Sequence, residues 1–457
     1  MASTLILLVI CALSWCRVEL GFGIFILLQT PLRNVGGSLV FHLLDMCVLL
    51  TVVARLITRK KEPNQDATVG FTEVCAIALS AVVLIRYLEF SPGGFELSSL
   101  IRCAFAPTLY GPLLVALGRL NRDEFGRLRG YMALCTAVIG IWGAIIYFTN
   151  SSYFIKTSIW GDLETSSAVA RMKSSDSSEL VKGRMAVMGL YTVLPYGVYY
   201  LIWEVFRRLR QSLTTATASL LAVALAFLTV GLSVTRSLLI LMVSSLTFVF
   251  LAVIISRGVE PKTKARAIAF AIIGTLLMLF LSSRLDLTPI VEQFQLRFGL
   301  FTTGDIGADQ RIQNTWSALE YLSGHLCIWG APGPDPLLTA NTSVDCPIIL
   351  QAWLKFGLVG AVLYLSIWLN ALLNLTSAWR LPRLNSEEVL ARIILTTSAV
   401  CYTYVFFVGF SMHPPEIFFS ILFLIETRNL THTALRSKVN LLEAKHVWEQ
   451  SVPRKSC

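Results

Sequence analysis

Residues Ser283 to Cys346 read SRLDLTPIVEQFQLRFGLFTTGDIGADQRIQNTWSALEYLSGHLCIWGAPGPDPLLTANTSVDC and form the longest polar stretch of the chain. We count nine apolar runs before them and three after. The stretch holds three arginines, seven carboxylates and no lysine. A loop of this length is usually functional or disordered, and its tryptophans, turn residues and two cysteines favour a folded one. We therefore expect the chain to be organised around this loop.

A short amphipathic helix is predicted inside the loop. Apolar residues recur there at spacings of three and four, at Ile312, Trp316, Leu319 and Leu322. Asp309 suits the N-cap and Gly324 the stop, which predicts a helix lying against a membrane surface. Arg311 falls in its first turn, where the helix dipole disfavours a cation, so another role is expected for it. Residues 330–336, rich in glycine and proline, predict tight turns.

Composition indicates a membrane protein. Apolar residues make up 55% and charged residues 14% of the 457 residues, and many apolar runs approach the 20 residues that a membrane helix needs. The formal net charge is +10, but the cations are spread over short connections instead of one patch. This distribution is a topology signal and argues against a nucleic-acid partner.

The apolar runs predict an all-α, polytopic transmembrane bundle of about twelve spans. Basic clusters fall at every second connection, so both termini and all these clusters are expected to be cytoplasmic. The first run is interrupted by Arg17 and Glu19 and lacks the basic start of a cleaved signal peptide. We expect spans near residues 3–28, 38–56, 69–89, 98–118, 130–149, 185–206, 214–231, 235–255, 267–283, 347–372, 391–410 and 415–428. The chain then divides into spans (1–283), a large external loop (284–346), further spans (347–430) and a cytoplasmic tail (431–457).

Several cations fall at the external level, where positive charge is unexpected. Arg86 has Glu89 on nearly the same helix face, so snorkelling or pairing explains it best. A phosphate or pyrophosphate is the natural ligand of the others, because guanidinium groups bind such oxygens in pairs. An anion transporter would show the same pattern. The candidate pyrophosphate-binding residues are Arg102, Arg236, Arg297, Arg311 and Lys355.

The cysteines of the loop predict a disulfide. The chain has ten cysteines, of which only Cys327 and Cys346 lie in the large external loop or at its edge. An oxidising compartment would let these two pair. The other eight suit small apolar packing positions or the tail.

Three segments together resemble a known superfamily. They are Arg311-x4-Trp316-x-Ala318, then His325-Leu-Cys-Ile-Trp-Gly330-Ala-Pro-Gly333, then Gly357-Leu-Val-Gly360 at the entry of a span. With Thr235-Arg236-Ser237 opening an earlier span, this pattern resembles the O-antigen polymerase and O-antigen ligase superfamily of bacterial envelopes. The resemblance is specific over residues 230–365, and elsewhere only hydropathy and span count agree.

The resemblance implies a metal-independent glycosyl transfer, without cofactor, at the periplasmic face of the bacterial inner membrane. The donor would be an oligosaccharide on undecaprenyl pyrophosphate and the acceptor a sugar hydroxyl. Arg236 and Arg311 match the family's arginines and would stabilise the departing pyrophosphate. A chain-length regulator and a flippase are the protein partners that the resemblance suggests.

One departure bears on the reaction. The ligase pattern has His-Asn ahead of its Gly-x-x-Gly, where this sequence has Cys346-Pro347. Asp345 and His325 are then the candidate bases for the acceptor hydroxyl, with Arg311 as the third catalytic candidate. The alternative roles are a helix cap for Asp345 and a turn residue for His325.

Three functions remain open from the sequence. The first is a polymerase that joins lipid-linked repeats into O-antigen or exopolysaccharide, which the missing His-Asn favours. The second is an O-antigen ligase or O-oligosaccharyltransferase that moves glycan from the carrier to a lipid A core or a protein. The third is a secondary transporter, although such transporters usually show related halves, and here the halves differ.

Overall fold

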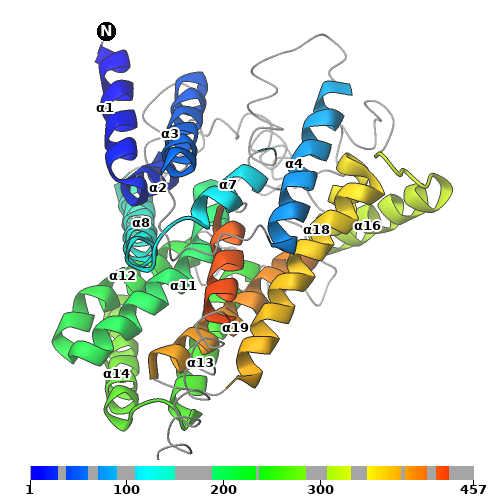
Figure 1. Cartoon of the computed structure of the whole chain (residues 1–457). Helices are drawn as coiled ribbons and strands as arrows, with labels where there is room; N and C mark the ends of the chain where they lie inside the picture. Colours follow the sequence, from blue (N-terminus) through cyan, green and yellow to red (C-terminus); the bar gives the residue numbers. More distant parts are fainter. Residues whose placement is uncertain are drawn as a thin grey trace, which may run out of the picture.

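The computed structural model describes residues 2–28, 38–59, 70–89, 108, 110–149, 188–232, 236–284, 306–330, 347–381, 386–408 and 418–431. Within these ranges the chain is all-α and contains no strand, as predicted (Figure 1). The predicted tail at 431–457 lies outside the described residues except for Thr431.

The helices follow the apolar runs closely. Those that match predicted spans are α3 (Ser38–Thr58), α4 (Phe71–Glu89), α8 (Arg122–Thr149), α11 (Met188–Gln211), α12 (Leu213–Leu232), α13 (Arg236–Ile255), α14 (Pro261–Arg284), α18 (Ile348–Arg380), α19 (Ser386–Val408) and the helical residues 418–431. The short helix α7 (Tyr110–Leu117) covers the end of the predicted span 98–118.

Length and composition single out α18. Among the described residues it is the one helix both long and apolar enough to cross a membrane, while 18–27, 46–58 and 241–255 are shorter apolar stretches. The twelve-span bundle therefore stays a prediction. Several helices nevertheless carry an outward apolar face. On α14 the exposed fractions are 56% for Ile272, 60% for Leu276 and 61% for Leu279.

The connections rich in arginine meet at one end of the bundle, which we call the basic end. Ion pairs and backbone hydrogen bonds of arginine join connections far apart in sequence there. Arg129 of α8 joins two other helices, because it pairs with Glu426 in the helical residues 418–431 and stacks on Trp203 of α11. The other contacts are Arg59 with Glu124, Arg119 with the carbonyl of Ile57, Arg210 with Glu387, Arg266 with the carbonyl of Leu209, and Arg428 with Glu73.

The opposite end, which we call the loop end, holds the start of α18 and the helix α16 (Ile306–Gly324). Helices α4 and α18 run antiparallel. Thr72 of α4 bonds Asn370 of α18, whereas Arg86 of α4 bonds the carbonyl of Lys355. Figure 1 shows α16 beside the yellow start of α18, on the far side of the bundle from α14.

The predicted first span, 3–28, is wrong as a single crossing. The chain forms α1 (Ala2–Cys16) and α2 (Val18–Leu28), separated at Arg17. A Cβ added to Gly21 would lie 2.9 Å from the Cβ of Ser14, so α2 folds back on α1. The physical reason is the interruption by Arg17 and Glu19, because Glu19 is buried beside Arg127 and bonds it.

The fold-back also sets the direction of α1. Trp15, near its end, lies under Arg55 near the end of α3, with 5.5 Å between the guanidinium carbon and the ring centroid. Helices α1 and α3 therefore both end at the basic end. Figure 1 shows the start of α1 at the opposite extreme of the bundle.

Small residues let the core helices approach closely, as is common where helices pack in membranes. A Cβ on Gly111 of α7 would lie 2.6 Å from the Cα of Ile77 in α4. A Cβ on Gly197 of α11 would lie 2.1 Å from the Oγ1 of Thr136 in α8. Rings then fill the centre, where Trp368 stacks on Phe423 and packs on Tyr402.

Candidate functional site at the junction of α16 and α18

Helix α16 is the predicted amphipathic helix of the large loop. It ends at Gly324 as predicted, but it begins at Ile306, three residues before the predicted N-cap Asp309. Asp309 therefore lies inside the helix. Arg311 lies in the second turn instead of the first, so the dipole penalty expected there is smaller, since it falls off within the first turn.

One side of α16 packs on the first half of α18. Ala318 and Leu322 are 3% and 5% exposed and form a small apolar cluster with Leu350 and Leu354. Helical spacing places position 311 on this side of α16, seven residues before Ala318 and eleven before Leu322. The junction thus brings the position of Arg311 toward α18.

The other side of α16 is apolar and uncovered. Ile312, Trp316 and Leu319 are 55%, 67% and 40% exposed, and their spacing puts them on one stripe. Trp329, just beyond the helix, is 61% exposed. Exposed tryptophan beside aliphatic side chains is typical of a helix at a membrane interface.

Helix α18 is kinked at Gly357, and the kink receives the segment that follows α16. Gly357 has φ 77° and ψ 176°, a conformation open in practice only to glycine. The amides after the kink bond this segment, with Leu358 N donating to Cys327 O at 3.1 Å and Val359 N to Ile328 O at 3.5 Å. Because a Cβ at Gly357 would lie 2.2 Å from the oxygen of Ile328, the two backbones are in direct contact.

A buried arginine closes this contact from α4. Arg86 is 8% exposed, and its Nε donates to the carbonyl oxygen of Lys355 at 3.4 Å. Gly330, with φ 101°, lies against the guanidinium, since an added Cβ would be 2.6 Å from Nη2 of Arg86. We call residues 325–330, Gly357 and Arg86 the clasp. It ties α4, α18 and the end of α16 together at the loop end.

Arg86 makes contacts that the sequence interpretation did not include, because its guanidinium lies between Gly330 and α18. Snorkelling or pairing with Glu89 was expected, and this stays a prediction because the side chain of Glu89 lies outside the described part of the chain. No local pattern indicates this contact, because the bonded residues are 269 positions apart. The available signal was a cation near the end of an apolar run, together with the two glycines that it helps to join.

His325 occupies the turn that follows α16. Its amide donates to the carbonyl of Tyr321 at 3.0 Å, and its ring stacks on the Tyr321 ring with 4.8 Å between centroids. Nδ1 lies 3.3 Å from the same carbonyl oxygen. When Nδ1 carries the proton and donates, Nε2 of this exposed ring has a free lone pair. The turn role is therefore realised, and it leaves a nitrogen that can accept a proton.

Lys355 lies at the same level and points outward. It stands about two turns into α18, as predicted, and its side chain is exposed. Gln351, one turn earlier, is 2% exposed and was missed from the sequence. The junction thus has two exposed basic side chains, Lys355 and His325, in addition to the buried Arg86.

The remaining predicted site residues are placed only in part. Arg236 begins α13, as predicted. Gly258, just after this helix, packs on Val389 at the basic end. Helix α13 therefore runs from the loop end to the basic end, and Arg236 lies on the side of the loop end. The side chains of Arg236 and Arg311 are not among the described ones, and Arg102, Arg297, Asp345 and Cys346 lie outside the described residues altogether.

Two further predictions concern the edge of the loop. The N-cap of α18 is Pro347, and because Asp345 lies outside the described residues, its capping alternative stays a prediction. Cys327 is half-buried and forms no disulfide with any described residue. Because Cys346 is not described, the disulfide stays a prediction.

No group of three or more histidines, cysteines or carboxylates in the described part of the chain could hold a metal ion. Comparison with protein-family models, with curated proteins and with solved structures finds no match.

Proposed function

We propose that the chain is a polytopic membrane protein with its basic end in the cytoplasm and its loop end outside. The gathering of arginine at one end supports this orientation, and the outward apolar faces support a lipid surrounding. Because α1 and α2 fold back at Arg17, the topology becomes a helical hairpin followed by eleven crossings. The N-terminus then lies outside, and only the C-terminus is cytoplasmic.

Within this topology, we propose that the chain is a polymerase that joins oligosaccharide repeats carried on undecaprenyl pyrophosphate into O-antigen or exopolysaccharide. One observation carries the proposal. The backbone of residues 325–330 contacts the backbone at Gly357 at the loop end. These are two of the segments in which the sequence resembles the superfamily. The same contact fixes α16 against α18, and α16 carries Arg311.

The chemistry is a glycosyl transfer with a pyrophosphate leaving group. The acceptor hydroxyl attacks the anomeric carbon of the donor sugar, its C–O bond to the carrier pyrophosphate breaks, and the hydroxyl proton passes to a base. Arg236 and Arg311 stabilise the negative charge that develops on the pyrophosphate. His325 supplies Nε2 as proton acceptor, and Asp345 is the second candidate for this task.

A ligase or O-oligosaccharyltransferase would use the same donor and leaving group. The sequence at Cys346-Pro347 favours the polymerase, because the histidine of the ligase pattern is missing there. An anion transporter shares the cations, but it would leave the glycans of the carrier unchanged in length.

Deletion of the gene tests the proposal. We expect acceptor that carries at most one repeat, or loss of secreted polymer if the product is an exopolysaccharide. A plasmid copy should restore long chains. Long polymer that accumulates on the carrier would make the chain a ligase, and unchanged glycans would contradict both transferase functions.

A further inference from the structure

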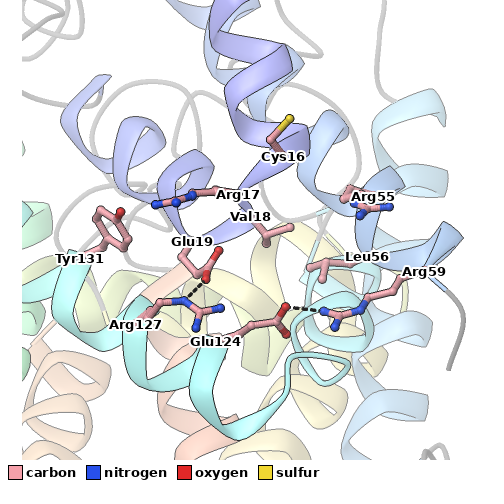
Figure 2. Close-up of a pocket in the computed structure, with 10 residues that line it drawn as sticks. All are labelled: Cys16, Arg17, Val18, Glu19, Arg55, Leu56, Arg59, Glu124, Arg127 and Tyr131. Carbon is pink, nitrogen blue, oxygen red and sulfur yellow. Dashed lines mark hydrogen bonds and ion pairs between the residues drawn. The ribbon is translucent and has the colours of Figure 1, made fainter. Parts of the chain in front are cut away.

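A cavity of about 460 Å³ opens at the basic end, where α1 breaks into α2 (Figure 2). Its walls come from the α1–α2 break, the end of α3 and the start of α8. Four arginines and two carboxylates line it: Arg17, Arg55, Arg59 and Arg127, with Glu19 and Glu124. The lining thus carries two more positive than negative charges.

Both carboxylates are already engaged by arginine. Glu19 accepts from Nε of Arg127 at 2.5 Å and Glu124 from Arg59 at 2.5 Å, as the dashed lines of Figure 2 mark. The other oxygen of Glu124 accepts from the amide of Asn121 at 3.0 Å, which completes a capping box at the start of α8. The hydrogen bond to Glu19 and then the charge of Glu19 raise the pKa of Arg127 above its ordinary value.

Two of the four arginines, Arg17 and Arg55, can bind a ligand. Arg17 and Arg55 have no carboxylate partner among the described residues, and Arg55 contacts the face of the Trp15 ring. Val18 and Glu19, the first two residues of α2, also line the cavity. The first amides of a helix lack an intrahelical acceptor and favour an anion. Two guanidinium groups and the start of a helix therefore line one cavity.

The surroundings of the cavity are apolar and outward-facing. Leu13 and Trp15 on α1 are 45% and 42% exposed, and Ile57 on α3 is 48% exposed. A ligand that combines a phosphate with acyl chains would fit both features, because its chains would cover these side chains while the phosphate entered the cavity. Basic pockets between membrane helices on the cytoplasmic side suit such headgroups.

We propose that this cavity binds the phosphate headgroup of an anionic phospholipid from the cytoplasmic leaflet, with Arg17 and Arg55 as its principal contacts. The proposal rests on the membrane topology of the proposed function but not on the glycosyl transfer. A bound lipid would bridge α1, α2 and α3 and hold the hairpin in place. The site is thus distinct from the junction of α16 and α18 at the loop end.

The test measures lipid binding by the full-length protein, purified in detergent and stripped of lipid. Phosphatidylglycerol should raise the thermal midpoint of the wild type saturably, while phosphatidylcholine and inorganic phosphate should not. For the double variant Arg17→Gln/Arg55→Gln we expect roughly thirtyfold weaker binding, from the loss of two cation–phosphate contacts. The control is Arg257→Gln/Lys262→Gln, which removes two exposed charges of the same end outside the cavity and should bind as the wild type does.

Three results would overturn the proposal: equal binding by the double variant and the wild type, equal loss in the control, or the same shift from inorganic phosphate alone. If the double variant does not fold, the exposed single variant Arg17→Gln takes its place, with anionic lipid retained by the protein counted by native mass spectrometry. Loss of glycan polymerisation with intact lipid binding would contradict the proposed function and leave this site standing.

Discussion

Gly357→Ala should open the clasp. The substitution adds a Cβ that would lie only 2.2 Å from the carbonyl oxygen of Ile328. It also forces alanine into a backbone conformation that it rarely adopts. The backbone cost is about 1–3 kcal/mol. The contact from Leu358 N to Cys327 O adds about 0.5–1.5 kcal/mol when it is lost. We therefore expect the substitution to destabilise the closed state, in which the segment 325–330 contacts α18, by roughly 2–4 kcal/mol. The segment should then detach more often.

Cys327 reports this opening, because its half-buried thiol lies inside the segment. In a chain that keeps Cys327 as its one cysteine, a maleimide should react with Gly357→Ala roughly 30 to 1,000 times faster than with the parent, since 1.4 kcal/mol corresponds to a factor of ten. Gly330→Ala should act in the same direction, because its Cβ would meet the guanidinium of Arg86.

Gly324→Ala is the matched control. This glycine ends α16, and nothing lies within 4 Å of an added Cβ, so labelling should stay near the parent rate. If Gly357→Ala labels no more than threefold faster than the parent, or if Gly324→Ala accelerates labelling as much, the clasp is not what holds the segment.

Three further predictions follow from the proposed site and topology. Arg236→Lys and Arg311→Lys should each abolish polymer at unchanged protein level, because a point charge loses the paired geometry for phosphate. Full activity of both variants would make Arg236 and Arg311 structural residues. Cys327 and Cys346 should gain maleimide reactivity together on reduction, with the bond contributing roughly 3 kcal/mol, and full labelling without reductant would rule the bond out. An epitope tag at the N-terminus should be reached in intact spheroplasts and one at the C-terminus only after permeabilisation, whereas an N-terminal tag that stays protected would contradict the hairpin at Arg17.

The patterns of hydropathy and charge predict most of the helices. Most predicted spans coincide with a helix, because an apolar run of this length satisfies its backbone hydrogen bonds best as a helix. Their ends are less accurate, since α8, α11, α14, α18 and α19 extend five to eight residues beyond the predicted spans. Gly324 ends α16 as predicted, since a glycine after the last apolar position favours a helix stop.

The contacts between distant segments did not follow from the sequence. Arg86 is buried where Gly330 and Gly357, two glycines of positive φ that are far from it in the chain, come together. The break at Arg17 depends on Glu19 finding Arg127, 108 residues away. In both cases a charged residue contacts groups that are far away in the sequence, which the spacing of residues along one helix does not reveal.

Reconstitution tests the central claim most directly. The purified protein would be placed in liposomes with lipid-linked repeats extracted from a deletion strain, and the glycan length on the carrier would be followed with the release of undecaprenyl pyrophosphate. The account predicts longer carrier-linked glycans, one undecaprenyl pyrophosphate released for each repeat joined, and neither product from Arg311→Lys. Repeats that stay single with the folded wild-type protein, or that lengthen equally with Arg311→Lys, would contradict it.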